Sequence, residues 1–309
     1  MSPSPTIHLG IDLGGTNLKW AVVEQSGDEW RAVDRGQQPT LAAEGPDAVV
    51  GRMIEIGRGA RERWPSLASI GVGVPGLYDP GTGATRFLVN FPGGWKGSPV
   101  APPIEAAVGL PTSLINDARA FGLAELRLGA GRGASALIGF TLGTGVGGFV
   151  AVDGRVHLGH DGTAGELGHQ TIDPDGPSCN CGNNGCVEAF ARADRLAEAC
   201  GAPSAEEAIA AARAGDHRAL AGFEAVGRRL GIGIANAVTV ISPDKVIIGG
   251  GNAVAGDLLL DPIRAELRRR VLTTALDDVE IVLAELGTWA GAIGAAVHGA
   301  EAAASVVPA

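Results

Sequence analysis

The sequence predicts an α/β protein built from two related domains. The main sign is an internal repeat, in which an apolar strand, a glycine-rich turn and a second apolar strand occur twice. The first copy is Gly10 to Val23 (GIDLGGTNLKWAVV) and the second is Gly139 to Val152 (GFTLGTGVGGFVAV). Stretches with helical periodicity separate further short apolar strands. Two hairpins of one design imply two domains that face each other and clamp a phosphate chain between their tips.

Composition limits the possible partners. The chain has 309 residues, of which 45% are hydrophobic, enough for two domains with their own cores. A net charge of −10 repels phosphate backbones and argues against nucleic-acid binding. Glycine or charge interrupts every apolar run well short of the roughly 18 to 20 residues of a membrane span, and the N-terminus lacks signal-peptide features. We therefore expect a cytoplasmic protein with no membrane partner.

The first hairpin begins with a strand over 7–13, continues through GGTN, and returns as a strand over 18–23. Glycine tolerates a positive φ and admits close approach, so backbone amides in such a turn can converge on a phosphate. The two copies differ at one informative position, where Asp12 aligns with Thr141. Asp12 could hold Mg²⁺ through water, or it could simply cap the turn.

The next stretch combines a packing helix with a long loop. Apolar residues Val49, Met53 and Ile56 alternate with charges and predict an amphipathic helix over 45–64. A strand over 69–74 then enters a Gly/Pro-rich loop that is long for a structural connection. Loops of this kind often carry binding residues, so Gly76 and Asn90 could approach a substrate, although Asn90 could equally satisfy its own turn.

A strand over 111–115 leads directly into Asn116 and Asp117, which begin a helix. Ligands of open α/β sheets bind at the carboxyl ends of strands, where a carboxylate is well placed to accept a proton. Asp and Asn also cap helices routinely. Position alone therefore leaves Asp117 as either a catalytic base or an ordinary N-cap.

The segment 165–188, GELGHQTIDPDGPSCNCGNNGCVE, concentrates metal-binding chemistry; we call it the cysteine loop. His169, Cys179, Cys181 and Cys186 supply the four ligands of a tetrahedral structural Zn²⁺, while Gly182 and Gly185 let the loop close. The alternative is a disulfide, which a Cys-x-Cys pair forms awkwardly and which leaves the histidine unexplained. A metal here would also orient Glu166 and Glu188, whose carboxylates suit a polyhydroxylated substrate.

After the cysteine loop the pattern is mainly helical, and Cys200 reads as a buried thiol. A strand over 245–248 ends in a third glycine loop, GGGN, which fits the sugar and base of a nucleotide. The last segment, WAGAIGAAVHGAEAAAS, is a helix whose Gly291 and Gly294 permit close packing, and we expect it to return to the first domain. The remaining elements are expected as helices over 186–200, 204–214, 217–240 and 258–271 and a strand over 279–284.

These residues together make the chain resemble the kinases of the ROK family, along essentially its whole length. DLGGT at 12–16, TLGTGVGG at 141–148 and IIGGGN at 247–252 are similar to the two phosphate loops and the adenosine loop of that family. The cysteine loop matches the family's zinc signature in order and spacing. The resemblance implies a ribonuclease-H-like, actin/hexokinase-type fold with an active-site cleft between its domains. The implied domains are 1–116 plus 290–309 and 117–289.

The resemblance also implies the chemistry, an ATP- and Mg²⁺-dependent transfer of phosphate to a hexose 6-hydroxyl, most simply that of glucose, with structural Zn²⁺. Asp117 would be the catalytic base. Arg119 and Phe121 depart from the small and amide residues common after the Asn-Asp pair. The residues implied to bind sugar are Gly76, Asn90, Asn116, Asp117, Glu166, His169 and Glu188. The residues implied to bind nucleotide are Asp12, Gly14, Gly15, Thr16, Lys19, Thr141, Gly143, Thr144, Gly145, Gly249, Gly250, Gly251 and Asn252.

Other functions remain open at this point. A kinase for an N-acetylated or amino hexose, mannose or fructose fits the same motifs. A transcriptional repressor needs a DNA-binding domain, for which the acidic chain shows no spare helix-turn-helix. A sugar sensor without catalysis is the third possibility. A homodimer or homotetramer is an expectation of the family.

Overall fold

A computed structural model describes residues 5–88 and 91–306. The chain divides into two compact units. The first comprises Met1–Arg132, Leu158–Ala164 and Thr288–Ala309, and the second comprises Gly133–His157 and Gly165–Gly287. This division extends the first unit beyond the expected boundary at Asn116, because the helix that follows Asn116 packs against the C-terminal helix of the same unit.

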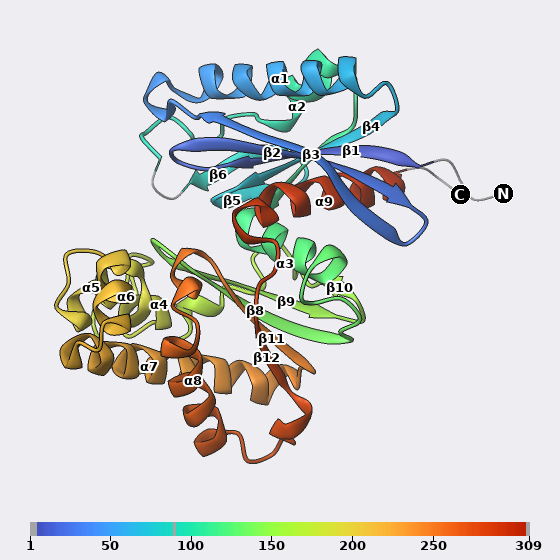
Figure 1. The fold of residues 1–309 in the computed structure, drawn as a ribbon. Coiled ribbons are helices and arrows are strands. Elements are labelled where there is room, and N and C mark those ends of the chain that lie inside the picture. Colours follow the sequence, from blue (N-terminus) through green and yellow to red (C-terminus); the bar gives the residue numbers. More distant parts are fainter. Residues whose placement is uncertain (1–4, 89–90, 307–309) are drawn as a thin grey trace. The chain divides into compact units, whose positions relative to one another are not determined.

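The first unit is organised around a mixed five-stranded sheet (Figure 1). β1 and β2 form the predicted hairpin, and β3 extends it at one edge. On the other side of β1 the strands β4 and β7 run parallel to it. Along the sheet the strands are β3 (Glu29–Pro39), β2 (Asn17–Ser26), β1 (Thr6–Leu13), β4 (Leu67–Val74) and β7 (Thr112–Asn116).

Helices cover both faces of this sheet (Figure 1). On one face α1 (Pro46–Arg63) packs with α2 (Ala101–Val108), and α1 buries Val49 and Met53 as its periodicity predicts. On the other face lie α3 (Asp117–Leu128) and α9 (Ala290–Val306). A short turn, η1 (Ala42–Glu44), precedes α1, and the Gly/Pro-rich loop contains a small hairpin of β5 (Gly76–Asp79) and β6 (Ala84–Leu88).

Glycines allow α9 to lie directly on its neighbours. A Cβ at Gly294 would overlap the carbonyl oxygen of Ala120 on α3, and Cβ atoms at Gly10 or Gly71 would overlap backbone atoms of α9. The backbones therefore touch without intervening side chains. The expectation that the last helix returns to the first domain is confirmed.

The second unit repeats the topology of the first. Its strands lie in the order β10 (Arg155–Val156), β9 (Val146–Val152), β8 (Ala136–Leu142), β11 (Lys245–Gly249) and β12 (Glu280–Leu283). β8 and β9 form an antiparallel hairpin, β11 runs parallel to β8, and β12 runs parallel to β11. The internal repeat predicted from the two glycine-rich hairpins is thus confirmed at the level of whole sheets.

The helices of the second unit share a large core with one face of its sheet. The helix expected over 186–200 is instead broken at Arg192, whose backbone is extended. No helix in the described part of the chain is both long and apolar enough to cross a membrane. The helical elements are η2 (Leu167–His169), α4 (Val187–Ala191), α5 (Ala193–Cys200), α6 (Ala205–Arg213), α7 (His217–Ile241), η3 (Gly251–Ala255), α8 (Asp257–Arg270), η4 (Leu276–Asp278) and η5 (Gly287–Trp289).

Candidate functional site

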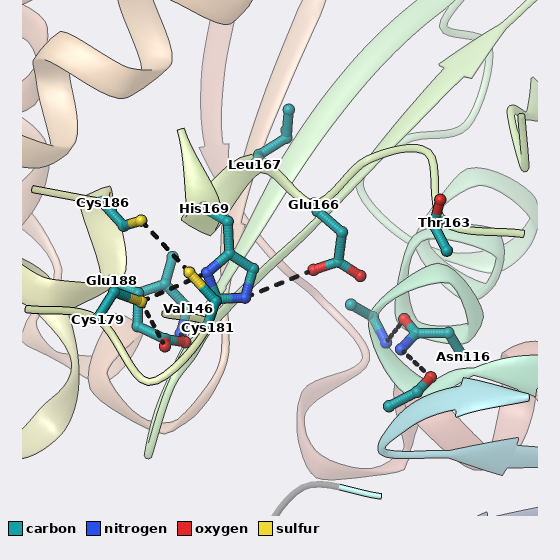
Figure 2. Close-up of polar contacts among 12 residues, drawn as sticks. Asn116, Val146, Thr163, Glu166, Leu167, His169, Cys179, Cys181, Cys186 and Glu188 are labelled. Carbon is teal, nitrogen blue, oxygen red and sulfur yellow. Dashed lines mark hydrogen bonds and ion pairs between the residues drawn. The ribbon is translucent and has the colours of Figure 1, made fainter. Parts of the chain in front are cut away.

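The cysteine loop gathers its four predicted ligands in one place (Figure 2). The ligand atoms of His169, Cys179, Cys181 and Cys186 all lie within 4.8 Å of one another. His169 ends η2, and Cys186 is the residue before α4. The loop closes tightly because Gly185 adopts a φ of +65° at a point where any Cβ would overlap the carbonyl oxygen of residue 173.

The spacing of these atoms fits a tetrahedral metal. With Zn–S bonds of about 2.3 Å and a Zn–N bond of about 2.0 Å, a tetrahedron has S–S edges of about 3.8 Å and S–N edges of about 3.5 Å. The Sγ atoms of Cys181 and Cys186 are 3.7 Å apart, and Cys179 Sγ is 3.6 Å from His169 Nδ1. A disulfide requires about 2.0 Å, and all four cysteines are free thiols. The donor set therefore suits Zn²⁺, and the disulfide alternative is excluded.

The surroundings shift the pKa values of the three thiols in different directions. Burial raises the pKa of the Cys179 thiol to about 12 and raises that of Cys186 as well. Burial acts in the same direction at Cys181, but hydrogen bonds from the Asn183 amide and from the other two thiols outweigh it and lower the Cys181 pKa. Since a metal binds thiolates, metal binding here must release protons.

Two carboxylates flank the cluster, as the sequence predicts (Figure 2). His169 turns Nδ1 to the cysteines and Nε2 to Glu166, whose Oε2 is 3.8 Å away. Both side chains are about one-third exposed, at 32% and 37%, so this pair can meet a ligand. Glu188 accepts a hydrogen bond from the Val146 amide at 2.9 Å, and its other oxygen is 3.6 Å from Cys179 Sγ. Glu188 thus joins the cysteine loop to the glycine turn of the second hairpin.

In the first unit Asp12 lies at the end of β1, between two glycines. A Cβ at Gly291 would come within 2.9 Å of the Asp12 carboxylate, and one at Gly73 would lie 3.7 Å from it. Burial and the nearby Asp117 carboxylate raise the pKa of Asp12 to about 7, while Lys19 opposes the shift. A nearby divalent cation favours the ionised form of a buried carboxylate, so Asp12 fits the role of holding Mg²⁺.

Asn116, rather than Asp117, caps helix α3. Its Oδ1 accepts hydrogen bonds from the Ala118 and Arg119 amides, and its Nδ2 donates to the carbonyl of Gly76 at 3.1 Å. Asp117 is the first residue of the helix, and one of its oxygens accepts from the Ala118 amide at 2.8 Å. The N-cap role that the sequence allowed for Asp117 is therefore filled by Asn116.

Arg119 is a feature that sequence reasoning noted but did not place. Its side chain is 1% exposed, and its guanidinium donates to Asn116 Oδ1 at 2.9 Å. It also donates to the carbonyl oxygens of Thr163 at 2.9 Å and Ala164 at 2.8 Å. An arginine among small helix residues was the available signal, but only the structure shows its partners.

The three glycine loops follow strands as predicted, but the reason for glycine is different. No glycine in either hairpin turn, 14–15 or 143–145, has a positive φ; only Gly250 in the third loop does, at +86°. Close approach matters instead, since Cβ atoms at Gly14 and Gly145 would lie 2.7 Å from Asn17 O and 2.6 Å from Glu188 Oε2.

Other expected site residues are placed as follows. Lys19 donates to the Thr288 carbonyl at 3.1 Å, so its ammonium is held at the start of the C-terminal segment. Asn252 is buried, and its Nδ2 has no partner within residues 5–88 and 91–306. Thr141 is the residue before the last of β8, and it lies opposite Gly249, which ends β11. Asn90 lies outside the described residues.

These observations define an α/β protein of two units, each with the same five-strand topology and a glycine-turn hairpin, and this is the fold of the actin- and hexokinase-type ATPases. The ROK family model matches residues 8–300. The chain therefore belongs to the ROK family. A glucokinase of Halalkalibacterium halodurans is 34% identical over 311 residues, covering 93% of this chain and 93% of that protein. An N-acetylmannosamine kinase of Citrobacter koseri is 33% identical, covering 80% of this chain and 84% of that protein.

Solved structures of ROK proteins are also similar to this chain. A ROK hexokinase from Thermus thermophilus superposes with a TM-score of 0.86 at 33% identity, covering 97% of this chain and all of that one. A ROK family glucokinase from Streptomyces griseus in complex with glucose and AMPPNP has a TM-score of 0.80 at 30% identity, covering 96% of this chain and 99% of that one. The chain is similar throughout to sugar kinases.

Proposed function

We propose that the protein transfers the γ-phosphoryl group of ATP to the 6-hydroxyl of a hexose, with glucose as the preferred acceptor. The observation that carries the proposal is the carboxylate of Asp117, at the end of a parallel strand and the start of a helix that Asn116 already caps. Similarity to glucokinases supports glucose as the acceptor. We expect the reaction in the cytoplasm, where ATP is made and thiols remain reduced.

In the proposed reaction the sugar hydroxyl oxygen bonds to the γ-phosphorus, the bond from that phosphorus to the β–γ bridging oxygen breaks, and ADP leaves. Asp117 accepts the hydroxyl proton, an effect typically worth about 10²- to 10⁴-fold. Asp12 would hold Mg²⁺ through water, and the ion when bound would neutralise phosphate charge. The glycine loops supply amides, and alignment accounts for much of the remaining acceleration.

Sugar recognition is proposed to depend on Asn116 and on the acidic and histidine side chains of the cysteine loop. Asn116 has its Oδ1 committed to three N–H donors, so its amide can offer sugar only the remaining Nδ2 hydrogen. Glu166 accepts hydrogen bonds from hydroxyls, and His169 Nε2, with Nδ1 on zinc, donates one. The backbone of Gly76 contributes by holding Asn116, and Glu188 is the further acceptor.

Zinc is proposed as a structural brace, held by His169, Cys179, Cys181 and Cys186. When bound it keeps the imidazole neutral and fixes its orientation. The carboxylate of Glu166 stands next to that imidazole, so the metal also determines where the acceptor oxygen lies.

A second candidate is a kinase for another hexose, such as an N-acetylated one. Arg119 and Phe121 favour considering it, because bulky side chains follow the Asn-Asp pair where the family commonly has small or amide residues. The N-acetylmannosamine kinase among the relatives is consistent with this alternative. A non-catalytic regulator is less well supported, since Asp12, Asp117 and the glycine loops are all present.

A coupled ADP-release assay tests the proposal. Purified protein is supplied with ATP and Mg²⁺ and with glucose, mannose, fructose, N-acetylglucosamine, N-acetylmannosamine or glucosamine, and polyphosphate replaces ATP in a parallel series. The expected result is ADP release that is fastest with glucose. Faster ADP release with an N-acetylated sugar would make that sugar, rather than glucose, the preferred acceptor. No ADP release with any sugar would refute the proposal that the protein is a sugar kinase.

A further inference from the structure

The segment Leu158–Ala164 belongs to the first unit although the second unit precedes and follows it in the chain. The segment closes on itself, because the Ala164 amide donates to the Leu158 carbonyl at 3.2 Å. Asp161 stiffens it by accepting from both the amide and the hydroxyl of Thr163, at 3.2 and 2.6 Å. We call it the crossing segment.

Arg119 attaches the crossing segment to helix α3. Its Nε and one terminal nitrogen reach two successive carbonyls, those of Ala164 and Thr163. A planar guanidinium that makes two such bonds fixes both distance and orientation, which a single ammonium cannot do. The segment also packs near Tyr78, since a Cβ at Gly162 would lie 3.7 Å from the Tyr78 hydroxyl.

The carbonyl of Ala164 belongs to the peptide that joins the two units. Its nitrogen is that of Gly165, the first residue of the second unit, and Glu166 follows immediately. Gly165 is closely packed, since a Cβ there would lie 3.0 Å from the Cα of Phe149 on β9, and its φ of +90° favours glycine. The orientation of the Ala164–Gly165 peptide therefore determines how the backbone enters Glu166.

The same guanidinium also holds Asn116, the residue before helix α3. A third N–H of Arg119 reaches Asn116 Oδ1 at 2.9 Å, and with the amides of Ala118 and Arg119 it forces the oxygen of that amide inward. The Nδ2 group then faces the carbonyl oxygen of Gly76. One buried side chain thus orients both Asn116 and the approach to Glu166.

We propose that Arg119 is a positioning residue for sugar binding, acting through the Asn116 amide and the Ala164–Gly165 peptide. The inference rests on the proposed function, because Asn116 and Glu166 are taken as sugar ligands. The hydrogen bonds of Arg119 go to Asn116 and to the crossing segment, so we expect it to govern KM for sugar more than KM for ATP or kcat. A displacement of about 1 Å at a ligand can cost roughly 10²-fold.

The central variant is Arg119→Met, which keeps most of the side-chain volume and removes all three hydrogen bonds. Its matched control is Arg127→Met on the same helix, where the lost arginine pairs with Glu301 instead. We expect KM for sugar to rise about ten- to hundred-fold in Arg119→Met and to be unchanged in the control, with KM for ATP within about twofold in both. Arg119→Lys should give an intermediate value, because an ammonium restores the charge and one carbonyl contact.

A second variant guards against misfolding of the first. Asp161→Ala alters an exposed residue, so it should fold, and it loosens the crossing segment by removing both hydrogen bonds from Thr163. It should raise KM for sugar in the same direction as Arg119→Met. Unchanged KM for sugar in both variants would overturn the proposal, as would an equal loss of sugar and ATP affinity.

Hydrogen exchange separates this inference from the proposed function, because it requires no sugar and no turnover. Amides in a peptide covering 158–166 should exchange faster in Arg119→Met than in the wild type or in Arg127→Met. If the wild type phosphorylates no sugar but this difference appears, the kinase proposal fails and the positioning of the segment stands. Unchanged exchange in Arg119→Met would reject the positioning role whatever the enzyme does.

Discussion

Replacing Gly294 by alanine tests the contact between α9 and α3. A Cβ at this position would lie 2.5 Å from the carbonyl carbon of Ala120 and 3.0 Å from its Cα, and closer still to its oxygen. All three are backbone atoms, so no side chain can rotate away. The two helices can therefore accommodate the added methyl group only by moving apart.

The change in the free energy of unfolding on Gly294→Ala follows from two opposing contributions. Overpacking of a filled core costs typically about 1 to 3 kcal/mol, and occasionally more. Alanine regains about 1 kcal/mol of helix propensity relative to glycine. Because the obstruction at Gly294 is rigid, we take the upper end of the first contribution, about 3 kcal/mol, subtract the gain of about 1 kcal/mol, and expect the free energy of unfolding to fall by about 2 kcal/mol or more.

Calorimetry and denaturant unfolding measure this change. Gly59→Ala is the matched control, since Gly59 lies on the exposed side of helix α1 with nothing within 4 Å of its Cβ position. The control should be unchanged or more stable by up to about 1 kcal/mol. If Gly294→Ala matched the wild type within about 0.5 kcal/mol, the direct backbone contact between α9 and α3 would be refuted.

Three further predictions concern the site and pH. Asp117→Asn should lower kcat about 10²- to 10⁴-fold while sugar still binds in a titration without ATP, and near-normal turnover would remove Asp117 as the base. Cys181→Ser should lower zinc content, measured by mass spectrometry, together with sugar affinity; Cys200→Ser is the control, and unchanged sugar affinity in zinc-free protein would contradict the brace. Burial lowers the pKa of His8 to about 4, so the folded state stays neutral while the unfolded chain gains a proton near pH 6.5, and stability falls as pH drops. From pH 7 to pH 5 the free energy of unfolding should fall by at most about 2 kcal/mol through His8. This fall should disappear in His8→Asn but remain in the control His217→Asn. A fall of the same size in His8→Asn would exclude His8 as its source.

Elements with a strong apolar pattern were predictable. The hairpins and strand β4 appear within a few residues of their expected positions, as does α7, because burial on one or both faces imposes a period that the sequence displays. Strand β3 was missed for the converse reason. It lies at the edge of its sheet and has no fully buried residue, so its sequence EWRAVDRGQQP carries no such period.

The cysteine loop was predictable because its ligands are close in sequence. His169 to Cys186 span few residues, and one histidine and three cysteines at this spacing are typical of a shared metal site. The sequence could not predict which residue caps the start of helix α3. Asn116 and Asp117 are equally good caps by residue type, and only the tertiary contact with Gly76 and Arg119 shows which side chain turns back onto the helix.

By itself the sequence determined the repeated α/β architecture, the metal-binding loop and the identity of the groups that carry charge, because periodicity and local spacing are properties of neighbouring residues. The tertiary structure alone decided the partners of groups distant in the chain. Burial and Asp117 together raise the pKa of Asp12, and Arg119 reaches carbonyls more than forty residues away. Such contacts depend on how separate elements pack, which no local pattern encodes.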